Sequence, residues 1–442
     1  MIRNPEEQEK VFLVGWSRSR GAGPAAMETG GPDPSSALQE LSELASSAGA
    51  SIVGAIYQRT AGPDPATLIG RGKAAELRAN AQDAGAGTVL FDHDLTPTQL
   101  RNLERIVGLK VIDRTQLILD IFAGRARTRE GKLQVELAQL TYLLPRLAGG
   151  GTSLSRLGGG IGTRGPGEQQ LEFDRRRIRA RIQTLCQALE RVRSQRALHR
   201  AHRQEQNFLM VALVGYTNAG KSTLFNKLTG AETVSSSRMF ATLDPTVRLI
   251  SLPSRRAPLL SDTVGFIRHL PPHLVTAFRA TLEELQTADL LLHVIDASHP
   301  RREQQTAAVE SQLEALGLRQ ATRLRIWNKI DRVDPLEIRG ASNLWDAAVS
   351  ARTGEGIQSL RAAIDQALTA SDPLVETEFS LPLADGEALA ALYRLGTVLS
   401  AHFEEGKVVV RARLRASCRD RFWASRLAAD QRSRQVVEVQ HL

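Results

Sequence analysis

The sequence predicts an α/β protein with several domains, and three observations lead to this prediction. The chain has 442 residues, which exceeds one ordinary domain, so two to four are expected. In the first 125 residues, short apolar runs alternate with helical patterns, as in a parallel α/β layer. A second strand, turn and helix pattern surrounds residues 215–222, and a smaller α+β pattern ends the chain.

Composition limits the class of protein. Hydrophobic residues make up 42% and charged residues 24%, as in soluble globular proteins. The net charge of +9 favours an anionic macromolecular partner, although charge alone is weak evidence. Cys186 and Cys418 are far apart, which excludes a disulfide scaffold and a cysteine metal site. We see no signal peptide and no apolar run long enough to cross a bilayer, so a location in the cytoplasm is expected. The protein is also expected to be a monomer.

The first predicted domain, residues 1–130, is a small parallel α/β domain. Its apolar runs predict strands at 11–16, 51–57, 88–91 and 110–112, and its periodic segments predict helices at 37–48, 74–84, 97–107 and 114–122. Residues 17–33 are rich in Gly, Pro and Ser and predict a mobile loop. The turn Gly70-Arg71-Gly72-Lys73 opens a helix, where free N–H groups could hold a phosphate, but a purely conformational need for glycine is the favoured interpretation.

Residues 131–205 predict a helical hairpin. Two apolar stripes share the spacing of four and three residues: Leu133, Leu137, Leu140, Leu144 and Leu147 in one helix, and Ile178, Ile182, Leu185, Leu189 and Val192 in the other. Matching stripes suggest two antiparallel helices. A second interpretation, that both stripes pack on the α/β layer, is compatible with the first.

A glycine-rich, basic connector, residues 149–168, joins the two helices. So many glycines predict a flexible loop without helix or strand. Arginines accompany it in the loop and along the second helix: Arg156, Arg164, Arg175, Arg176, Arg177, Arg179, Arg181, Arg191, Arg193, Arg196, Arg200 and Arg203. Because arginine binds phosphate bidentately, a nucleic-acid backbone is the favoured ligand over an ordinary solvated face.

A phosphate-binding loop follows at Gly215-Tyr216-Thr217-Asn218-Ala219-Gly220-Lys221-Ser222. Its glycines let backbone N–H groups converge on a β-phosphate, Lys221 supplies a cation to the β and γ oxygens, and Ser222 offers a hydroxyl to Mg²⁺. Apolar residues 208–214 before it predict a strand, and residues 223–228 after it predict a helix. With that context, a capping turn that binds nothing is the weaker interpretation.

Later motifs follow the order that a GTP-binding domain, residues 206–371, requires. Thr242, in the segment 240–246, is the candidate switch threonine that joins Mg²⁺ when the γ-phosphate is present, with Thr246 as the second choice. After a strand at 258–261, Asp262 is placed to hold Mg²⁺ and the Gly265 N–H to contact the γ-phosphate. Further strands are expected at 247–252, 290–295 and 323–327.

The tetrapeptide Asn328-Lys329-Ile330-Asp331 indicates the base. The Asp331 carboxylate can accept from the ring N–H and the exocyclic amine of guanine, a donor pair that adenine lacks. Asn328 and Lys329 brace the pocket. A last strand beginning at 347 brings Ser350 and the Ala351 N–H to the guanine carbonyl.

At these residues the chain resembles the translation-factor-related Ras-like GTPases and, among them, the HflX family. The runs at 117–123 and 131–140, the loop at 159–168 and Asp174-Arg175-Arg176 are similar to that family's N-terminal signature. The resemblance spans 68–370; residues 375–442 resemble the less distinctive C-terminal domain of some members, and residues 1–50 match poorly. It implies a Ras-like P-loop GTPase domain between the N-terminal α/β domain with its hairpin and a C-terminal α+β domain, residues 372–442.

The resemblance further implies a GTPase that binds the large ribosomal subunit, with the hairpin and glycine-rich loop on ribosomal RNA, and that splits or rescues stalled ribosomes under stress. GTP or GDP and Mg²⁺ are the expected ligands. The expected nucleotide contacts are Gly215, Tyr216, Thr217, Asn218, Ala219, Gly220, Lys221, Ser222, Thr223, Phe240, Thr242, Asp262, Gly265, Asn328, Lys329, Asp331, Ser350 and Ala351. The expected metal ligands are Ser222, Thr242 and Asp262, and the expected catalytic residues are Lys221, Thr242 and Gly265.

Two positions qualify the expected mechanism. Phe266 stands where Ras carries the glutamine that orients water, so slow intrinsic hydrolysis is expected, with a partner or the switch backbone positioning the water. Asn218 stands where potassium-dependent relatives carry asparagine, which suggests K⁺ near the phosphates; stabilisation of the loop explains it equally well. Two further readings stay open: an RNA-remodelling ATPase or GTPase that uses the turn at 70–73, and a GTP-gated RNA-binding module whose hydrolysis only resets it.

The C-terminal segment predicts a small α+β module. Alternating runs at 397–403 and 407–413 predict a hairpin beside a helix at 385–394. No catalytic pattern is evident there. Its arginines either touch RNA or form ordinary surface: Arg411, Arg413, Arg415, Arg419 and Arg421.

Overall fold

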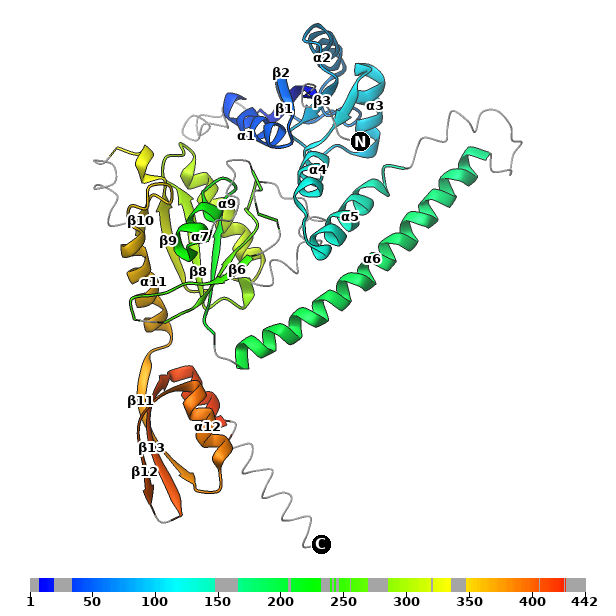
Figure 1. Cartoon of the computed structure of the whole chain (residues 1–442). Helices are drawn as coiled ribbons and strands as arrows, with labels where there is room; N and C mark the ends of the chain where they lie inside the picture. Colours follow the sequence, from blue (N-terminus) through cyan, green and yellow to red (C-terminus); the bar gives the residue numbers. More distant parts are fainter. Residues whose placement is uncertain are drawn as a thin grey trace.

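The computed structural model describes residues 8–19, 34–147, 166–205, 208–231, 239–240, 242–243, 246–254, 256–268, 285–318, 321–334, 347–404, 406–424 and 426. Three separate sheets organise this part of the chain, two of them mainly parallel and one antiparallel (Figure 1). The predicted fold class, two α/β units followed by a small α+β unit, is confirmed.

The first sheet has the strand order β2-β1-β3-β4 and is parallel throughout. Its elements are β1 (Lys10–Arg18), α1 (Pro34–Ser47), β2 (Ser51–Thr60), α2 (Arg71–Asp83), β3 (Thr88–Phe91), α3 (Pro97–Val107), β4 (Lys110–Ile112) and α4 (Arg114–Arg125). Local chemistry sets some ends: Thr96 and Gln99 form a capping box before α3, and Gly108 ends that helix in a left-handed conformation. The loop predicted at 17–33 starts later than expected because β1 continues through Arg18; residues 20–33 lie outside the described part.

The hairpin consists of α5 (Arg129–Leu143) and α6 (Pro166–Glu205), which lie side by side in Figure 1. The buried face of α5, including Val135, Ala138 and Tyr142, joins the same apolar cluster as α4. Its predicted leucine stripe is only partly buried, and an ion pair of Arg181 with Glu136, at 2.7 Å, joins the helices beside it. Helix α5 therefore packs against both α4 and α6, so both interpretations of the stripes hold in part.

The connector prediction needs one correction. Residues 166–168 were expected in a flexible loop, but α6 begins at Pro166. Proline suits a first helical position because its missing N–H would have no intrahelical partner there. The rest of the connector, through residue 165, lies outside the described part of the chain, as do Arg156 and Arg164.

The second sheet has the order β10-β9-β8-β5-β7-β6, with only β6 antiparallel to its neighbour. Its elements are β5 (Met210–Gly215), α7 (Lys221–Thr229), β6 (Thr246–Leu249), β7 (Leu259–Asp262), β8 (Leu290–Asp296), α9 (Arg302–Ala315), β9 (Arg323–Asn328), the short helix η4 (Ile330–Arg332), β10 (Ala347–Val349) and α11 (Ile357–Ser371). Every strand expected here is present, with ends that match the prediction or are shifted by up to three residues. Because the carboxyl ends of parallel strands share one edge, the motif residues that follow β5, β7, β9 and β10 converge there.

The third sheet is antiparallel, in the order β11-β13-β12. Its elements are β11 (Leu374–Pro382), α12 (Gly386–Leu395), β12 (Gly396–Glu404) and β13 (Lys407–Arg415). The predicted hairpin and helix are present, and β11 adds a strand that was not predicted. Within the described residues, none of the helices is both long and apolar enough to cross a membrane.

Candidate nucleotide-binding site

The phosphate loop joins β5 to α7, and its two glycines are required by close neighbours. Gly215 has φ 152°, and a Cβ there would lie 2.3 Å from the Val294 carbonyl oxygen. Gly220 has φ 93°, and a Cβ there would lie 2.2 Å from the Asn328 amide nitrogen. Larger residues would therefore be strained in conformation and blocked by neighbours. The loop turns tightly enough to aim the N-terminus of α7 at a cavity of about 320 Å³.

Lys221 is the buried cation of this site, with 6% of its surface exposed. Its Nζ donates to the carbonyl oxygens of Gly215, at 3.1 Å, and of Tyr216, at 2.8 Å. Burial lowers the pKa of Lys221 to about 8, against a partly opposing effect of Asp262. An anion in the cavity would restore the favourable environment that burial removes.

Three oxygen-bearing side chains meet at the edge of the cavity. The hydroxyls of Ser222 and Thr242 each donate to Asp262 Oδ2 at 2.7 Å and lie 2.7 Å from each other. Burial raises the pKa of Asp262, while these two hydroxyls oppose the rise. The other carboxylate oxygen, Oδ1, is buried and has no hydrogen-bond partner within the described residues. A hard cation such as Mg²⁺ fits this donor set, since it prefers oxygen ligands and would satisfy the unpaired oxygen.

The base-recognition end is built around Asn328, which is 1% exposed. Its Nδ2 donates to the Ala219 carbonyl at 2.9 Å, and its Oδ1 accepts from the Ala351 N–H at 2.9 Å. Lys329 Nζ lies 2.7 Å from Asp296 Oδ2, and Asp331 accepts from the Ser350 hydroxyl at 2.7 Å. Asn328 thus ties the phosphate loop to the loop after β10, and Asp331 lies exposed at the cavity.

Thirteen of the eighteen expected nucleotide contacts line the cavity, from the phosphate loop through Phe240 and Gly265 to Ala351. The others are placed differently: Gly215, Tyr216, Ala219, Asp262 and Ser350 do not form its wall. Thr246, the second candidate for the switch threonine, lies in β6 opposite Asp262 instead. Sequence reasoning missed three lining residues, Thr263, Arg332 and Arg352, which directly follow motif residues and carry no pattern of their own.

The N-terminal domain lies against the loops of this site, which the sequence did not predict. The ring of Phe122 in α4 meets that of Phe240 edge to face, with centroids 4.7 Å apart. The Met239 N–H donates to Ser47 Oγ of α1 at 2.9 Å. Both contacts fall just before Thr242, so Met239 and Phe240, at the start of the predicted first switch segment, pack on α1 and α4. The sequence does not reveal this interface, because its contacts come from single residues such as Ser47 in α1 and Phe122 in α4, which belong to no recognisable motif.

Strand order, phosphate loop and guanine-type motif together define a P-loop GTPase. Three family models match successive parts of the chain: the GTP-binding GTPase N-terminal model over residues 35–123, the GTP-binding GTPase middle region over 125–203, and the 50S ribosome-binding GTPase model over 210–329. The GTPase HflX of Caldanaerobacter subterraneus subsp. tengcongensis is 47% identical over 390 residues, which are 88% of this chain and 90% of that protein. The GTPase HflX of Escherichia coli (strain K12) is 46% identical over 385 residues, 85% of this chain and 89% of that protein.

The chain therefore belongs to the HflX family of GTPases, binds GTP and hydrolyses it. The family resemblance seen in the sequence is confirmed. Among solved structures, a GTP-binding protein from the archaeon Sulfolobus solfataricus in complex with GDP is 24% identical and covers 82% of this chain and 99% of that chain. The TM-score for this pair is 0.42.

Proposed function

We propose that this GTPase is a ribosome-binding switch that contacts mainly the large subunit and its RNA, and that it acts in ribosome splitting or rescue under stress. Support comes from the match of residues 210–329 to a model described as a 50S ribosome-binding GTPase. The observation that carries the proposal is the basic hairpin, whose second helix, α6, extends well beyond α5 in Figure 1. A cytoplasmic location follows from such a partner.

The charge of α6 supports RNA as the ligand of the hairpin. The acidic residue Glu172 forms ion pairs with two arginines, Arg176 at 3.4 Å and Arg179 at 4.0 Å. Arg177 and Arg191 are exposed on the same helix. One sign of charge dominates, which is the pattern that phosphate binding requires.

For the GTPase site we propose the following roles. Lys221 neutralises the β and γ oxygens, and the Gly265 N–H contacts the γ-phosphate. Ser222, Thr242 and Asp262 hold Mg²⁺, which when bound neutralises negative charge on the phosphates. Thr242 loses its place when the γ-phosphate leaves, which makes it the reporter of the nucleotide state.

Intrinsic hydrolysis is slow in this proposal, because Phe266 is apolar and 3% exposed and cannot orient water. Activation by a partner contributes as much as ~10⁵ in rate in related GTPases. The ribosome is the partner that the proposal assigns. Hydrolysis measured with and without ribosomes checks this, and equal rates would argue against it.

Guanine specificity is assigned to Asp331. Its carboxylate accepts from Ser350 through one oxygen and keeps capacity for the guanine donors. Replacement of Asp331 by Asn offers a donor where the base also donates, and is expected to lower GTP affinity by about 100-fold or more. Competition of a fluorescent guanine nucleotide by GTP, GDP and ATP measures it.

K⁺ as a second cation stays a proposal with an equally good alternative. Asn218 has φ 61°, a left-handed conformation that asparagine tolerates better than most residues, so the backbone alone explains its presence. If K⁺ assists hydrolysis, replacing it by Na⁺ lowers kcat on ribosomes. The same kcat in both salts would exclude a catalytic K⁺.

The test of the main proposal is sedimentation with separated ribosomal subunits. Binding to the large subunit is expected with a non-hydrolysable GTP analogue and weaker binding with GDP, while ATP should not substitute. A variant with Arg177→Glu and Arg191→Glu should lose binding yet keep GTP affinity. The matched control, Arg78→Glu with Arg101→Glu, makes the same charge change at exposed positions of α2 and α3 and should bind normally.

Nucleotide-independent sedimentation, or none at all, would refute ribosome binding as a switched property. Subunit dissociation measured with GTP and with its non-hydrolysable analogue then separates two versions. Equal dissociation means that binding energy does the work and hydrolysis resets the protein. Dissociation with GTP alone means that hydrolysis drives it.

A further inference from the structure

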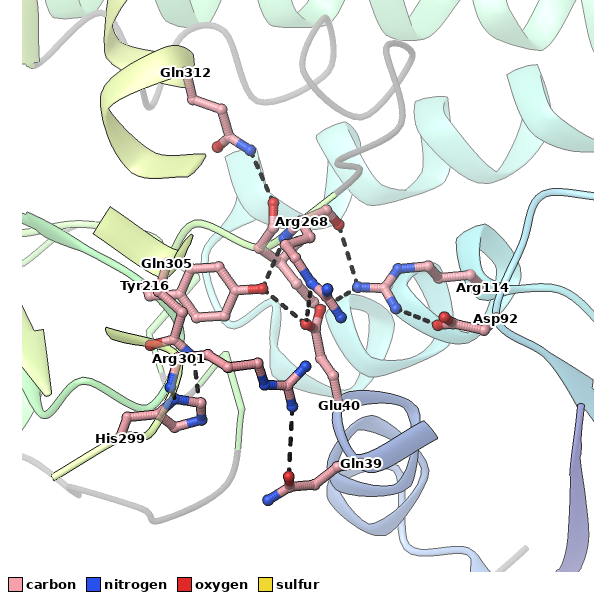
Figure 2. A network of polar contacts seen from close by, with 11 residues as sticks. Gln39, Glu40, Asp92, Arg114, Tyr216, Arg268, His299, Arg301, Gln305 and Gln312 are labelled. Carbon is pink, nitrogen blue, oxygen red and sulfur yellow. Dashed lines mark hydrogen bonds and ion pairs between the residues drawn. The ribbon is translucent and has the colours of Figure 1, made fainter. Parts of the chain in front are cut away.

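The carboxylate of Glu40, in α1, lies where the N-terminal domain meets the GTPase domain (Figure 2). Its Oε2 accepts from the Tyr216 hydroxyl at 2.9 Å and from Arg268 Nε at 2.9 Å. Tyr216 belongs to the phosphate loop, and Arg268 lies three residues after Gly265. A single acidic side chain of one domain therefore joins two catalytic segments of the other.

The rest of the network keeps this carboxylate charged. Arg114 donates to Glu40 Oε1, to the Arg268 carbonyl at 3.2 Å and to Asp92 at 2.6 Å. Glu40 and Arg114 are 8% and 3% exposed. Burial opposes the charge on Glu40, but Arg114 and Arg268 outweigh this effect and hold its pKa below the ordinary value. Buried charges of this kind are costly when one partner is removed, because the others lose their compensation.

The same two segments are also joined by their backbones. The Thr217 N–H donates to the Phe266 carbonyl at 2.7 Å, and the Phe266 N–H donates to the Gly215 carbonyl at 3.1 Å. The Arg268 N–H donates to the Tyr216 hydroxyl at 2.9 Å. Gly265 lies so close that a Cβ there would be 3.0 Å from Lys221 Nζ. The place of Gly265 beside the phosphates therefore depends on how this segment is held.

We propose that Glu40 is a positioning residue for GTP hydrolysis, because it holds Arg268, and with it the segment that carries Gly265, against the phosphate loop. Glu40, Tyr216 and Arg268 do not line the nucleotide cavity, so Glu40 acts through the segment it holds. The N-terminal domain thereby contributes to the geometry of catalysis. This proposal rests on GTP hydrolysis and is independent of ribosome binding.

The competing explanation is an ion pair that merely fastens two domains. A fastening role affects stability and leaves the kinetics of the folded enzyme unchanged. A positioning role lowers kcat while KM stays nearly the same, since Glu40 itself does not line the nucleotide cavity and acts only through the segment that it holds. The two explanations therefore differ in what the folded variant does.

The first test is intrinsic GTP hydrolysis, without ribosomes, by Glu40→Gln. The amide nearly preserves the size of the side chain but removes the charge that holds Arg268. We expect kcat to fall about tenfold, since small misplacements of reacting groups have effects of this size or larger. KM should be unchanged, and hydrogen exchange at the Arg268 amide should be faster. The matched control is Asp92→Asn, which removes the other carboxylate on Arg114 without touching Tyr216 or Arg268, and it should keep the kcat of the unaltered protein.

The second test is a double-mutant cycle. Arg268→Gln should lower kcat as much as Glu40→Gln, and the combined variant should be no slower than either, because both changes break one linkage. The proposal is overturned by unchanged kcat in folded Glu40→Gln, by an equal loss in Asp92→Asn, or by additive losses. If Glu40→Gln does not fold, Arg268→Gln decides alone, and an unchanged kcat in that variant overturns the proposal. Ribosome sedimentation of the same variants is a separate readout, so failure here leaves the ribosome proposal intact.

Discussion

Two helices of this chain begin at glycine-containing turns with a lysine nearby, and they differ in almost every other respect. Helix α2 follows Gly70 and contains Gly72 and Lys73, while α7 follows the phosphate loop and begins with Lys221. In sequence, both offer glycines and a cation at a helix N-terminus. In the structure, the second turn lines the nucleotide cavity, whereas the first turn only leads into α2 and does not line this cavity.

The glycines show the difference most directly. Gly70 has φ −58° and ψ 153°, which any residue adopts, and a Cβ on Gly72 would meet no atom within 4 Å. Gly215 and Gly220 have positive φ, and a Cβ on either would fall within 2.3 Å of another atom. Glycine at 70 and 72 is therefore optional, and glycine at 215 and 220 is required. What makes a phosphate loop is the crowding around the turn, which the local pattern does not contain.

The two lysines differ as well. Lys73 lies on the outside of α2 and pairs with Glu76, three residues on, at 2.8 Å. Lys221 is buried beneath the loop and donates to two of the loop's own carbonyls. Its environment favours an added anion, whereas Lys73 is already neutralised by its helix. The geometry thus favours one nucleotide site, at β5–α7, over an additional ATP site at β2–α2.

The largest expected effect tests the lysines. Lys221→Ala should lower GTP hydrolysis by about 1,000-fold, because a preorganised charge at the phosphates is lost. Lys73→Ala should leave the hydrolysis of both GTP and ATP unchanged. Steady-state phosphate release measures both. An ATPase activity that survives Lys221→Ala but disappears in Lys73→Ala would reverse the comparison.

The next effect concerns the glycines. Gly215→Ala should destabilise the GTPase domain by about 3 kcal/mol, because the conformation is strained and the Val294 carbonyl blocks the new methyl group. Gly72→Ala should stabilise α2 by up to about 1 kcal/mol, since alanine is the better helix former and the space is open. Urea denaturation of each variant gives the signs. Destabilisation by Gly72→Ala would mean that the first turn also requires glycine.

The third effect is a loss of stability at acid pH that originates in the sheet of the GTPase domain. His293, in the central strand β8, is 2% exposed, and burial together with Arg323, Lys221 and Arg325 lowers its pKa to about 4. Between its ordinary pKa of 6.5 and 4, the unfolded chain binds a proton that the folded chain does not, so stability falls as pH falls. The loss across this window should reach about 3 kcal/mol. His293→Leu should lose less stability than the unaltered protein over the same pH range in urea titrations; parallel curves would contradict this assignment.

The smallest effect tests the ion pair of α2. Glu76→Ala should cost about 0.3 kcal/mol, as for a surface pair three residues apart on a helix. GTP hydrolysis should not change. A measurable change in nucleotide binding would show that Lys73 acts beyond its own helix.

Sequence patterns predicted those parts of the molecule that depend on local backbone chemistry. The phosphate loop, the turn after β7 and the Asn328 motif each follow an apolar strand, so their place at one sheet edge was deducible from strand order alone. The meeting of Thr242 with Ser222 and Asp262 at the edge of the cavity also agrees with the three metal ligands expected from the sequence. Their chemical roles stay predictions until variants are measured.

What could not be predicted depends on how domains pack. Glu40 is one acidic residue in a polar helical pattern, and nothing in its neighbourhood indicates that it meets Arg268, which lies 228 positions away. Strand β11 was missed although inward-facing Val375, Phe379 and Leu381 alternate with exposed residues. Thr377 interrupts the apolar face, and Leu374 and Pro382 are exposed at the two ends, so the alternation is weak in the sequence. Long-range contacts of this kind are fixed by the assembled layers, and single residues do not encode them.

Helix α6 has a mechanical consequence. Its 40 residues span about 60 Å at the usual rise of an α-helix, and its last residue is separated by only a few positions from β5, the strand that carries the phosphate loop. A rod of that length converts a tilt of one degree at its base into a displacement of about 1 Å at its tip. A small change of angle near the nucleotide-binding site would therefore become a displacement comparable to an atomic radius at the far end of α6. If the GTPase domain tilts the base of α6, the length of the helix makes the movement of its far end larger than the movement at its base.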